Sequence, residues 1–110
     1  MHISNLQIMD SFNTRCYKIL KQVPKGKITT YKSIAQRLGT KAYRAVGNAM
    51  NKNPYDTKVY PCHRVIKSSG EIGGYAKGTK AKISRLKSEG IEIVNGKINL
   101  EKYSFNFSQK

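Results

Sequence analysis

Pro61-Cys62-His63-Arg64-Val65-Ile66 is the run with the clearest potential for chemistry, because it sets a thiol beside an imidazole and a guanidinium. A thiolate is a strong nucleophile, and basic or cationic neighbours help to form it. Neighbouring side chains often point apart, so the Cys-His pair needs a third group that orients the imidazole. Glu89, one of only six acidic residues, is the candidate, and a solvated carboxylate at a helix end is its alternative role.

The other residues of the kinds that bind metals or cofactors form no recognisable site. The chain has two cysteines and two histidines, and their spacing matches no metal-ligand pattern. Cys16 fits the apolar face of a helix, so we expect it to be a core residue. Gly73-Gly74 lacks the preceding strand and the spacing of a dinucleotide site. We therefore expect no metal and no cofactor.

The charge of the chain is strongly unbalanced, with 21 Lys and Arg residues against 6 Asp and Glu and a formal net charge of +15. The basic residues are spread along all 110 residues, which favours a polyanionic partner such as nucleic acid. The sequence shows no lipid-binding amphipathic helix, no membrane-spanning apolar run and no secretory leader. We therefore expect no membrane partner and an intracellular location, in the cytoplasm or with the DNA of the nucleoid or nucleus.

Apolar residues at helical spacing predict four helices, over about residues 12–23, 31–38, 41–52 and 79–89. Ser11 or Asp10 is expected to cap the first helix and Thr30 the second, since their side chains accept hydrogen bonds from free backbone N–H groups. Gly39 is expected to end the second helix. In the fourth helix we expect Ile83 and Leu86 to face inward and the basic residues to face mainly outward: Lys80, Lys82, Arg85 and Lys87.

The second and third predicted helices, joined by the short Gly39-Thr40 turn, are typical of a helix-turn-helix motif. The third helix has a polar and basic exposed side that suits contact with DNA, while an ordinary solvated face is the commoner role of such a surface. Its expected buried residues are Ala42, Ala45, Val46, Ala49 and Met50, and its expected exposed residues are Lys41, Arg44, Asn48, Asn51 and Lys52.

Two short hairpins are predicted in the second half of the chain. Residues 65–67 and 71–72 flank a Ser-Ser-Gly turn, where a helix-turn-helix domain would carry its wing. Residues 91–94 and 97–100 flank Asn95-Gly96, which suits a type I′ turn. The last ten residues are polar, and we expect them to fray. The predicted fold class is mainly α with small β-hairpins, arranged as a winged helix-turn-helix DNA-binding domain.

The residues around Cys62 belong to a longer ordered set. Asn53-Pro54 precedes the cysteine run and Gly73-Gly74-Tyr75 follows it. The set also includes Phe12, Pro24, Gly26, Thr30-Tyr31, Ala35, Leu38-Gly39, the run from Arg44 to Met50, and Glu89-Gly90. Together these residues cover about 12–98, and their order and spacing resemble the O6-alkylguanine-DNA alkyltransferases, also called methylated-DNA–protein-cysteine methyltransferases.

This resemblance implies a monomeric winged helix-turn-helix domain that enters the minor groove of double-stranded DNA. It would flip an O6-alkylguanine, or an O4-alkylthymine, out of the stack and transfer the alkyl group irreversibly to Cys62. The chemistry is consistent with the residues, since displacement at a saturated carbon needs a soft nucleophile and a proton for the leaving group. No cofactor is implied.

The resemblance also implies roles for individual residues. His63, oriented by Glu89, would activate Cys62 through a water. Tyr31 would crowd the target phosphate and assist protonation of the leaving guanine, and Arg44 would fill the gap left by the flipped base. Asn53 would support the turn that leads to Cys62. The other implied DNA contacts are Lys41, Ala45, Gly47, Asn48 and Asn51, and the implied base pocket comprises Tyr75, Ala76, Gly74, Met50 and Val65.

The sequence departs from the family pattern in two respects, and two other functions remain open. Many relatives carry an additional N-terminal domain, whereas we expect residues 1–110 to form one catalytic domain with a core of about 12–100. Ala76 stands where some relatives have a hydroxyl residue. The alternatives are a non-catalytic winged-helix protein that binds lesions or regulates transcription, and a small Cys-His hydrolase. Non-catalytic relatives replace the cysteine, commonly by tryptophan, but this chain keeps Cys62 and has no tryptophan.

Overall fold

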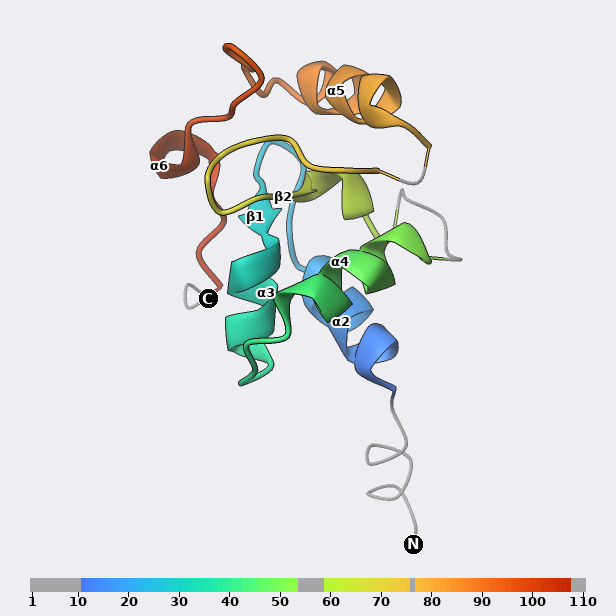
Figure 1. The fold of residues 1–110 in the computed structure, drawn as a ribbon. Helices are drawn as coiled ribbons and strands as arrows, with labels where there is room; N and C mark the ends of the chain where they lie inside the picture. Colours follow the sequence, from blue (N-terminus) through green and yellow to red (C-terminus); the bar gives the residue numbers. More distant parts are fainter. Residues whose placement is uncertain (1–10, 54–58, 76, 108–110) are drawn as a thin grey trace, which may run out of the picture.

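Helices supply most of the regular structure in the computed structural model, which describes residues 11–53, 59–75 and 77–107 (Figure 1). Within those ranges the α-helices are α2 (Phe12–Leu20), α3 (Tyr31–Arg37), α4 (Tyr43–Asn51), α5 (Thr79–Ser88) and α6 (Leu100–Tyr103). A short 3₁₀ helix, η1, covers Cys62–Arg64, and two strands, β1 (Thr29–Thr30) and β2 (Val65–Ile66), complete the described elements. The predicted mainly helical class is confirmed.

The first two predicted helix starts are confirmed by their capping hydrogen bonds. Ser11 Oγ accepts from the backbone N–H of Thr14 at 3.1 Å, and Thr30 Oγ1 accepts from that of Ser33 at 3.0 Å. Each bond satisfies one of the N–H groups that a helix leaves without an internal partner. The predicted end of α3 is also correct, because Gly39 follows the helix with a φ of 74°.

The helices α2, α3 and α4 pack together at one end of the molecule, and α5 and α6 lie at the other (Figure 1). A buried hydrogen bond from the Tyr17 hydroxyl to the carbonyl of Ala49, at 2.8 Å, links α2 to α4. The first core cluster lies between these helices and also contains Cys62; its members are Cys16, Tyr17, Leu20, Ile34, Ala35, Val46, Ala49, Met50, Cys62 and Val65.

Helix α4 begins later than predicted, and part of its predicted buried face is wrong. Ala42 is exposed and precedes the helix, and Ala45 is only partly buried. The cause is a local turn, in which Tyr43 N donates to the carbonyl of Lys41 at 2.8 Å and Ala42 N donates to Thr40 Oγ1 at 3.2 Å. These bonds hold residues 40–42 outside the helix, while Val46, Ala49 and Met50 are buried as predicted.

The small sheet joins two distant segments, so the first hairpin prediction is wrong. Strands β1 and β2 pair in parallel, with Thr29 opposite Val65 and Thr30 opposite Ile66. The predicted turn does form, since Lys67 N donates to the carbonyl of Glu71 at 3.0 Å, but no hairpin ladder extends from it in the described residues. Both residues of β2 are fully buried, which suits parallel pairing inside a protein. The sheet holds the start of α3 beside the segment that follows Cys62.

Residues 101–107 of the C-terminal segment pack against the protein, contrary to the expectation that the last ten residues fray, and residues 108–110 lie outside the described residues. Phe105 N donates to the carbonyl of Ile28 at 2.8 Å, and Tyr103 and Phe107 are buried. The aromatic residues Tyr103, Phe105 and Phe107 alternate with polar residues and make these contacts, which the mostly polar composition did not predict. The Asn95-Gly96 turn is confirmed, with φ values of 54° and 74° between the paired residues Val94 and Lys97. The predicted strands beside it are wrong, because in the described residues the hairpin pairing ends at this bridge and Leu100 begins α6. The second core cluster here comprises Ile28, Ile66, Ile72, Leu86, Ile91, Ile98 and Tyr103.

None of the helices in the described ranges has both the length and the apolar character needed to cross a membrane.

Candidate active site

Cys62 opens the 3₁₀ turn η1 and is almost completely buried, with 5% of its surface exposed. Its backbone N–H donates to the carbonyl of Tyr60 at 2.8 Å, and Arg64 N donates to that of Pro61 at 2.9 Å, so the turn is held at both ends. The other cysteine, Cys16, lies fully buried in α2, where burial raises the pKa of its thiol to about 11. The prediction that Cys16 is a core residue is confirmed.

His63 and Glu89 are brought together by this turn and by the end of α5. The Nε2 atom of His63 lies 2.9 Å from Oε2 of Glu89, and Glu89 is the C-cap residue of α5. The His63 side chain is completely buried, and its other ring nitrogen, Nδ1, has no hydrogen-bond partner. A negative charge at the C-terminal end of a helix interacts unfavourably with the helix dipole. The hydrogen bond to His63 gives a reason for a glutamate at this position.

Arg64 fixes the Glu89 carboxylate from its other side. Its Nε atom donates to Oε1 of Glu89 at 2.8 Å and its Nη2 atom donates to Oε2 at 2.7 Å, which makes a bidentate pair. The remaining Nη1 atom donates to the carbonyl of Val23 at 2.8 Å. His63 and Arg64 therefore anchor the turn to the end of α5, and Arg64 also anchors it to the loop after α2.

The charges of this cluster follow from burial and hydrogen bonding. Burial lowers the pKa of His63, and the nearby Arg85 and Arg64 also lower it, while the hydrogen bond and charge of Glu89 oppose them. Burial alone would raise the pKa of Glu89, but hydrogen bonds from Arg64 and His63 outweigh it and lower that pKa. Glu89 is therefore a carboxylate near neutral pH and His63 is a neutral imidazole. Nε2–H then donates to Glu89, which leaves Nδ1 with its lone pair as a base.

Lys82 corrects the prediction for α5, because it is completely buried instead of facing outward. Its Nζ atom donates to the backbone carbonyls of Val65, Ile72 and Gly74 at 2.7, 2.6 and 3.0 Å. One ammonium group thus holds together β2 and the loop that leads to Tyr75. Lys82 lies four residues before the buried Leu86, so helical spacing places both on one face. This spacing could have predicted that Lys82 is buried, but a charged lysine is normally expected on the surface.

Lys82 also joins Tyr31 to the site. Its Nζ atom lies 3.5 Å from the Tyr31 hydroxyl and 5.8 Å from the centre of the Tyr31 ring. Burial lowers the pKa of Lys82 to about 8, and a thiolate at Cys62 would oppose that shift. Burial also raises the pKa of Tyr31, and a thiolate at Cys62 would raise it further, so the phenol keeps its proton. A proton donor and a cation therefore share the surroundings of the thiol.

The loop from Gly73 to Tyr75 packs closely against these groups. Gly73 has a φ of 78°, and a Cβ there would lie 3.2 Å from the Tyr31 hydroxyl, so this close approach requires glycine. The buried Tyr75 hydroxyl lies close enough to Arg85 and Cys62 for both side chains to act on its pKa. Burial raises that pKa, a thiolate at Cys62 would raise it further, and Arg85 opposes the increase. Tyr31 and Tyr75 are therefore two protonated phenols beside Cys62.

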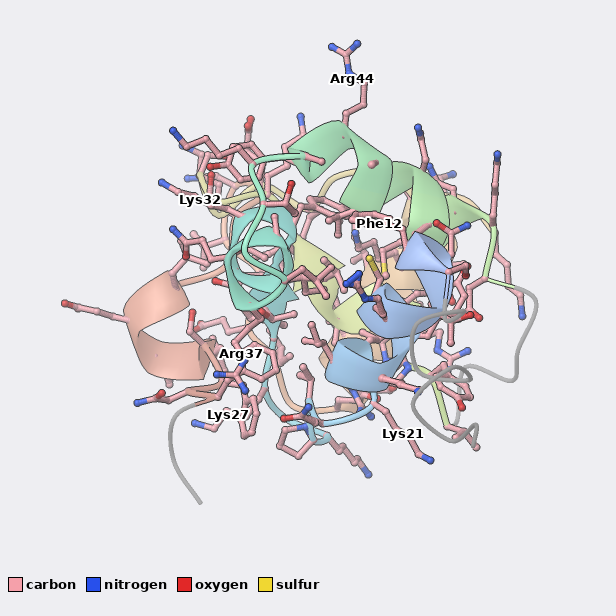
Figure 2. All side chains as sticks on the ribbon, turned by 90° about the horizontal axis from the view of Figure 1, so that it is seen from below. Phe12, Lys21, Lys27, Lys32, Arg37 and Arg44 are labelled. Carbon is pink, nitrogen blue, oxygen red and sulfur yellow. The ribbon has the colours of Figure 1, made fainter. Side chains whose placement is uncertain are left out.

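A cleft of about 620 Å³ opens from Tyr31 across the outer face of α4. Arg44, at the start of α4, projects away from the body of the protein (Figure 2). The predicted residues Tyr31, Arg44, Gly47, Asn48 and Asn51 all line this cleft. Sequence reasoning missed the rest of the lining, which comprises Lys32, Tyr43, Lys67, Ser68 and Ser69. The sequence pattern placed the Ser68-Ser69 turn where a wing would lie. Because a wing lies beside the helix-turn-helix motif, that position was the available signal that the turn lines the cleft.

Other predicted site residues lie outside the cleft. Met50 and Val65 are buried in the first core cluster with Cys62 and do not line the cleft along α4, so their place in a base pocket stays a prediction. Lys41 and Ala45 are also absent from the cleft lining. Asn53 Nδ2 donates to the carbonyl of Tyr60 at 3.1 Å, between α4 and the cysteine segment. Ala76 lies outside the described residues.

The described ranges contain no group of three or more His, Cys, Asp or Glu residues that could hold a metal ion.

Known proteins of related sequence and structure share this arrangement of elements. The profile of the 6-O-methylguanine DNA methyltransferase DNA-binding domain matches residues 11–91. A bifunctional methyltransferase/endonuclease of Picrophilus torridus is 48% identical over 91 residues, which are 82% of this chain and 30% of that protein. A methylated-DNA–protein-cysteine methyltransferase of Saccharolobus solfataricus is 48% identical over 82 residues, or 74% of this chain and 52% of that protein.

Among solved structures, S. pombe Atl1 in complex with damaged DNA containing O6-carboxymethylguanine is 36% identical, with a TM-score of 0.77. The similarity covers 89% of this chain and 97% of that one, and it confirms the predicted winged-helix class. The chain thus spans about half of the Saccharolobus protein and almost all of Atl1. With the profile match over most of its length, the chain belongs to the family of the 6-O-methylguanine DNA methyltransferase DNA-binding domain.

Proposed function

We propose that this protein repairs alkylated double-stranded DNA by accepting the alkyl group of O6-alkylguanine on Cys62. The observation that carries the proposal is the buried His63, which Glu89 holds by Nε2 at 2.9 Å and whose Nδ1 has no hydrogen-bond partner. A neutral imidazole in the same short turn as a cysteine supplies the base that nucleophilic thiol chemistry requires. The names and DNA complexes of the relatives support the substrate class.

The proposed reaction is a single displacement in which atoms and charges balance. His63 takes the thiol proton through Nδ1, by way of a water, and the thiolate attacks the alkyl carbon. The S–C bond forms as the bond from that carbon to O6 breaks, and the electron pair of the broken bond stays on guanine. Tyr31 donates a proton to the leaving guanine, and the proton held by His63 then replaces the one that Tyr31 gave, so that both side chains end neutral. The thioether product is stable, so each molecule reacts once.

The cleft along α4 is the proposed surface for DNA, entered from the minor groove. Extruding a base from the stack costs a few kcal/mol, so a side chain that fills the gap lowers the cost of the flipped state. Arg44 projects from α4 at the cleft and suits that role (Figure 2). Tyr31 lines the cleft and also lies 3.5 Å from Lys82, so it connects the DNA surface to the buried site. A flipped base would pass Tyr31 to reach Cys62 and Tyr75.

A second candidate function is lesion recognition without alkyl transfer. The observation that favours it is the 97% coverage of S. pombe Atl1, whose structure contains DNA with O6-carboxymethylguanine. The presence of Cys62 beside an oriented imidazole favours transfer, because binding alone requires no such pair.

Intact-mass analysis after incubation with a duplex containing O6-methylguanine separates the two functions. Alkyl transfer predicts the gain of one methyl group by the wild-type protein and by Cys16→Ala, because the pKa of Cys16 is raised to about 11 and its thiol is inert. Cys62→Ala should bind the duplex without a change in mass. Unmodified wild-type protein that binds the lesion would establish recognition alone, and methylation of Cys62→Ala would assign the acceptor to another residue.

A further inference from the structure

Tyr43, the first residue of α4, is a large aromatic side chain that the core does not use. It lies immediately before Arg44, 39% of its surface is exposed, and it is not among the residues that pack on the first core cluster. A single exposed apolar residue is ordinary on a protein surface. The position of this ring, and not its exposure alone, therefore has to indicate a role.

Tyr43 lies between two hollows of the surface. One is the cleft of about 620 Å³ along α4, and the other is a smaller hollow of about 320 Å³. The end of α3 and the turn after it line the smaller hollow, together with Tyr43: Gln36, Gly39, Thr40, Lys41 and Tyr43. In the described residues Tyr43 is the one residue common to both linings, so it forms a ridge between them.

Hydrogen bonds hold the backbone on which this ridge stands. Thr40 N donates to the carbonyl of Ala35 at 3.0 Å, which ties the turn to α3. Ala42 N donates to Thr40 Oγ1 at 3.2 Å, and Tyr43 N donates to the carbonyl of Lys41 at 2.8 Å. A side chain that separates stacked bases must not be pushed aside, and a turn fixed to the helix before it meets that requirement.

The surface beside the ridge is low and positively charged. Gly47 lies about one helical turn after Tyr43, and a Cβ added there would meet nothing within 4 Å. Glycine inside a helix lowers stability, and packing does not require it here, so a partner that approaches the helix closely accounts for it. Lys32, Arg44 and Lys67 line the cleft, and no Asp or Glu of the described residues lines either hollow. A closely approaching polyanion fits both features.

The spacing of Tyr43 and Arg44 is close to the spacing of stacked bases. Consecutive Cα atoms are about 3.8 Å apart, and the bases of one strand follow each other at about 3.4 Å. Neighbouring side chains on a helix point about 100° apart, so the two side chains cannot enter the same gap. With Arg44 in the gap left by a flipped base, Tyr43 reaches the next base step along the groove.

We propose that Tyr43 is a second wedge, whose ring enters the base step next to the flipped nucleotide and stacks on the neighbouring base. Minor-groove proteins insert apolar side chains between base steps, and stacking on an aromatic ring is favourable for every base. Such a wedge lowers the cost of extruding the target, so Tyr43 is a positioning residue. The inference rests on the proposed function through Arg44, but it concerns the opening of DNA and not transfer to Cys62.

The test compares two duplexes that carry O6-methylguanine. In one the base pair beside the lesion is matched, and in the other it is a mismatch, which is already partly unstacked and needs a wedge less. Methyl transfer to each duplex, and to the free O6-methylguanine base, is followed by intact mass. The affinity for the same two duplexes is measured with proteins that also carry Cys62→Ala, so that no transfer occurs. The control, Val94→Ala, shortens a side chain that is 56% exposed and lies outside both hollows.

Tyr43→Ala should slow transfer on the matched duplex by about tenfold, and on the mismatched duplex and the free base by less than about twofold. Affinity should fall in the same pattern in the Cys62→Ala proteins. Tyr43→Phe, which keeps the ring, and Val94→Ala should behave like the parent protein. If Tyr43→Ala is unstable, Tyr43→Leu should show the same preference for the mismatched duplex with a smaller loss.

Equal losses on the two duplexes, or no loss on the matched one, would show that Tyr43 is not a wedge. A wild-type protein that gains no methyl group would overturn the proposed alkyl transfer alone, because the affinities of the Cys62→Ala proteins still decide whether Tyr43 opens the base step.

Discussion

Glu89 carries two functions on one carboxylate, since it bonds His63 through Oε2 and Arg64 through both oxygens. Burial acts to raise the pKa of Glu89, and Arg64 and His63 together lower it, so loss of Arg64 would remove part of what keeps the carboxylate charged. Arg64 is therefore a positioning residue, which acts on Cys62 only through Glu89 and His63. Its third hydrogen bond, to the carbonyl of Val23, ties this cluster to the core.

The state of His63 makes stability depend on pH in a defined direction. The folded pKa of His63 lies below its ordinary value of 6.5, so below that pH the unfolded chain binds a proton before the folded chain does. The unfolding free energy should therefore fall as the pH drops from about 6.5 through the folded pKa. Glu89, with a pKa lowered from 4.5, should extend the loss below pH 4.5.

Urea unfolding of wild-type protein and His63→Gln at several values between about pH 7.5 and about pH 3.5 measures this effect. The variant should lose most of the slope between pH 6.5 and 5 and keep the decline below 4.5. Alkyl transfer by the wild-type protein should slow over the same upper range, because an imidazolium accepts no proton. Equal slopes for the two proteins would assign the acid sensitivity to other groups.

At the level of single residues, sequence reasoning found the residues of the proposed reaction more readily than the residues that hold them in place. Cys62, His63 and Glu89 are recognisable because their types and their resemblance to a family define a chemistry. Lys82 was misplaced because lysine is almost never fully buried, and its burial depends on three carbonyls supplied by Val65, Ile72 and Gly74. Backbone acceptors on a distant loop leave no signal in residue types.

At the level of elements, two strands of two residues each do much of the positioning. Strand β1 leads directly into α3 and Tyr31, and β2 directly follows η1 and Cys62, so their pairing fixes the phenol near the thiol. The helices were predictable from local signals such as the Ser11 and Thr30 caps. The parallel pairing was not, because it joins residues far apart in sequence and no short-range pattern specifies it.

Helix α4 provides a test of the DNA-binding role at this scale. Arg44→Ala should slow repair of O6-methylguanine in a duplex by about tenfold or more, because an empty gap leaves the cost of unstacking uncompensated. Reaction with free O6-alkylguanine base, which needs no extrusion, should change little. Lys52→Ala, just after the same helix, is the control and should affect both substrates slightly. Equal slowing of both substrates by Arg44→Ala would remove the proposed role of this side chain. Single-turnover rates for the two substrates provide the comparison.

At the level of the whole molecule, charge dominates the expected behaviour with DNA. The net charge of +15 indicated a polyanionic partner, but only the structure shows which basic residues line the cleft along α4. Net charge is a sum over residues, whereas the cleft lining depends on how the helices pack. The C-terminal segment shows the same limit, because its contacts with Ile28 were not visible in its polar composition.

Salt dependence measures the charges that contact DNA. The logarithm of the binding constant should fall with the logarithm of salt concentration by about 0.9 for each phosphate contact. Lys32 and Lys67 both line the cleft, so Lys32→Gln with Lys67→Gln should reduce the slope by about 1.8. Lys80→Gln with Lys87→Gln, on α5, should reduce it by clearly less. A slope that both variants change equally would show that overall charge, and not the cleft, governs binding.

The burial of Cys62 has a consequence for the fate of the protein after it reacts. Its sulfur lies in a packed core cluster beside the residues of α2 and α4, with 5% of the side chain exposed. An added methyl group must find space there, and overpacking of a core costs about 1–3 kcal/mol. Small domains have only about 5–15 kcal/mol of stability to lose. Under the proposed reaction, the used molecule therefore unfolds more often than the unused one, and ordinary cellular proteolysis could remove spent protein without any separate signal.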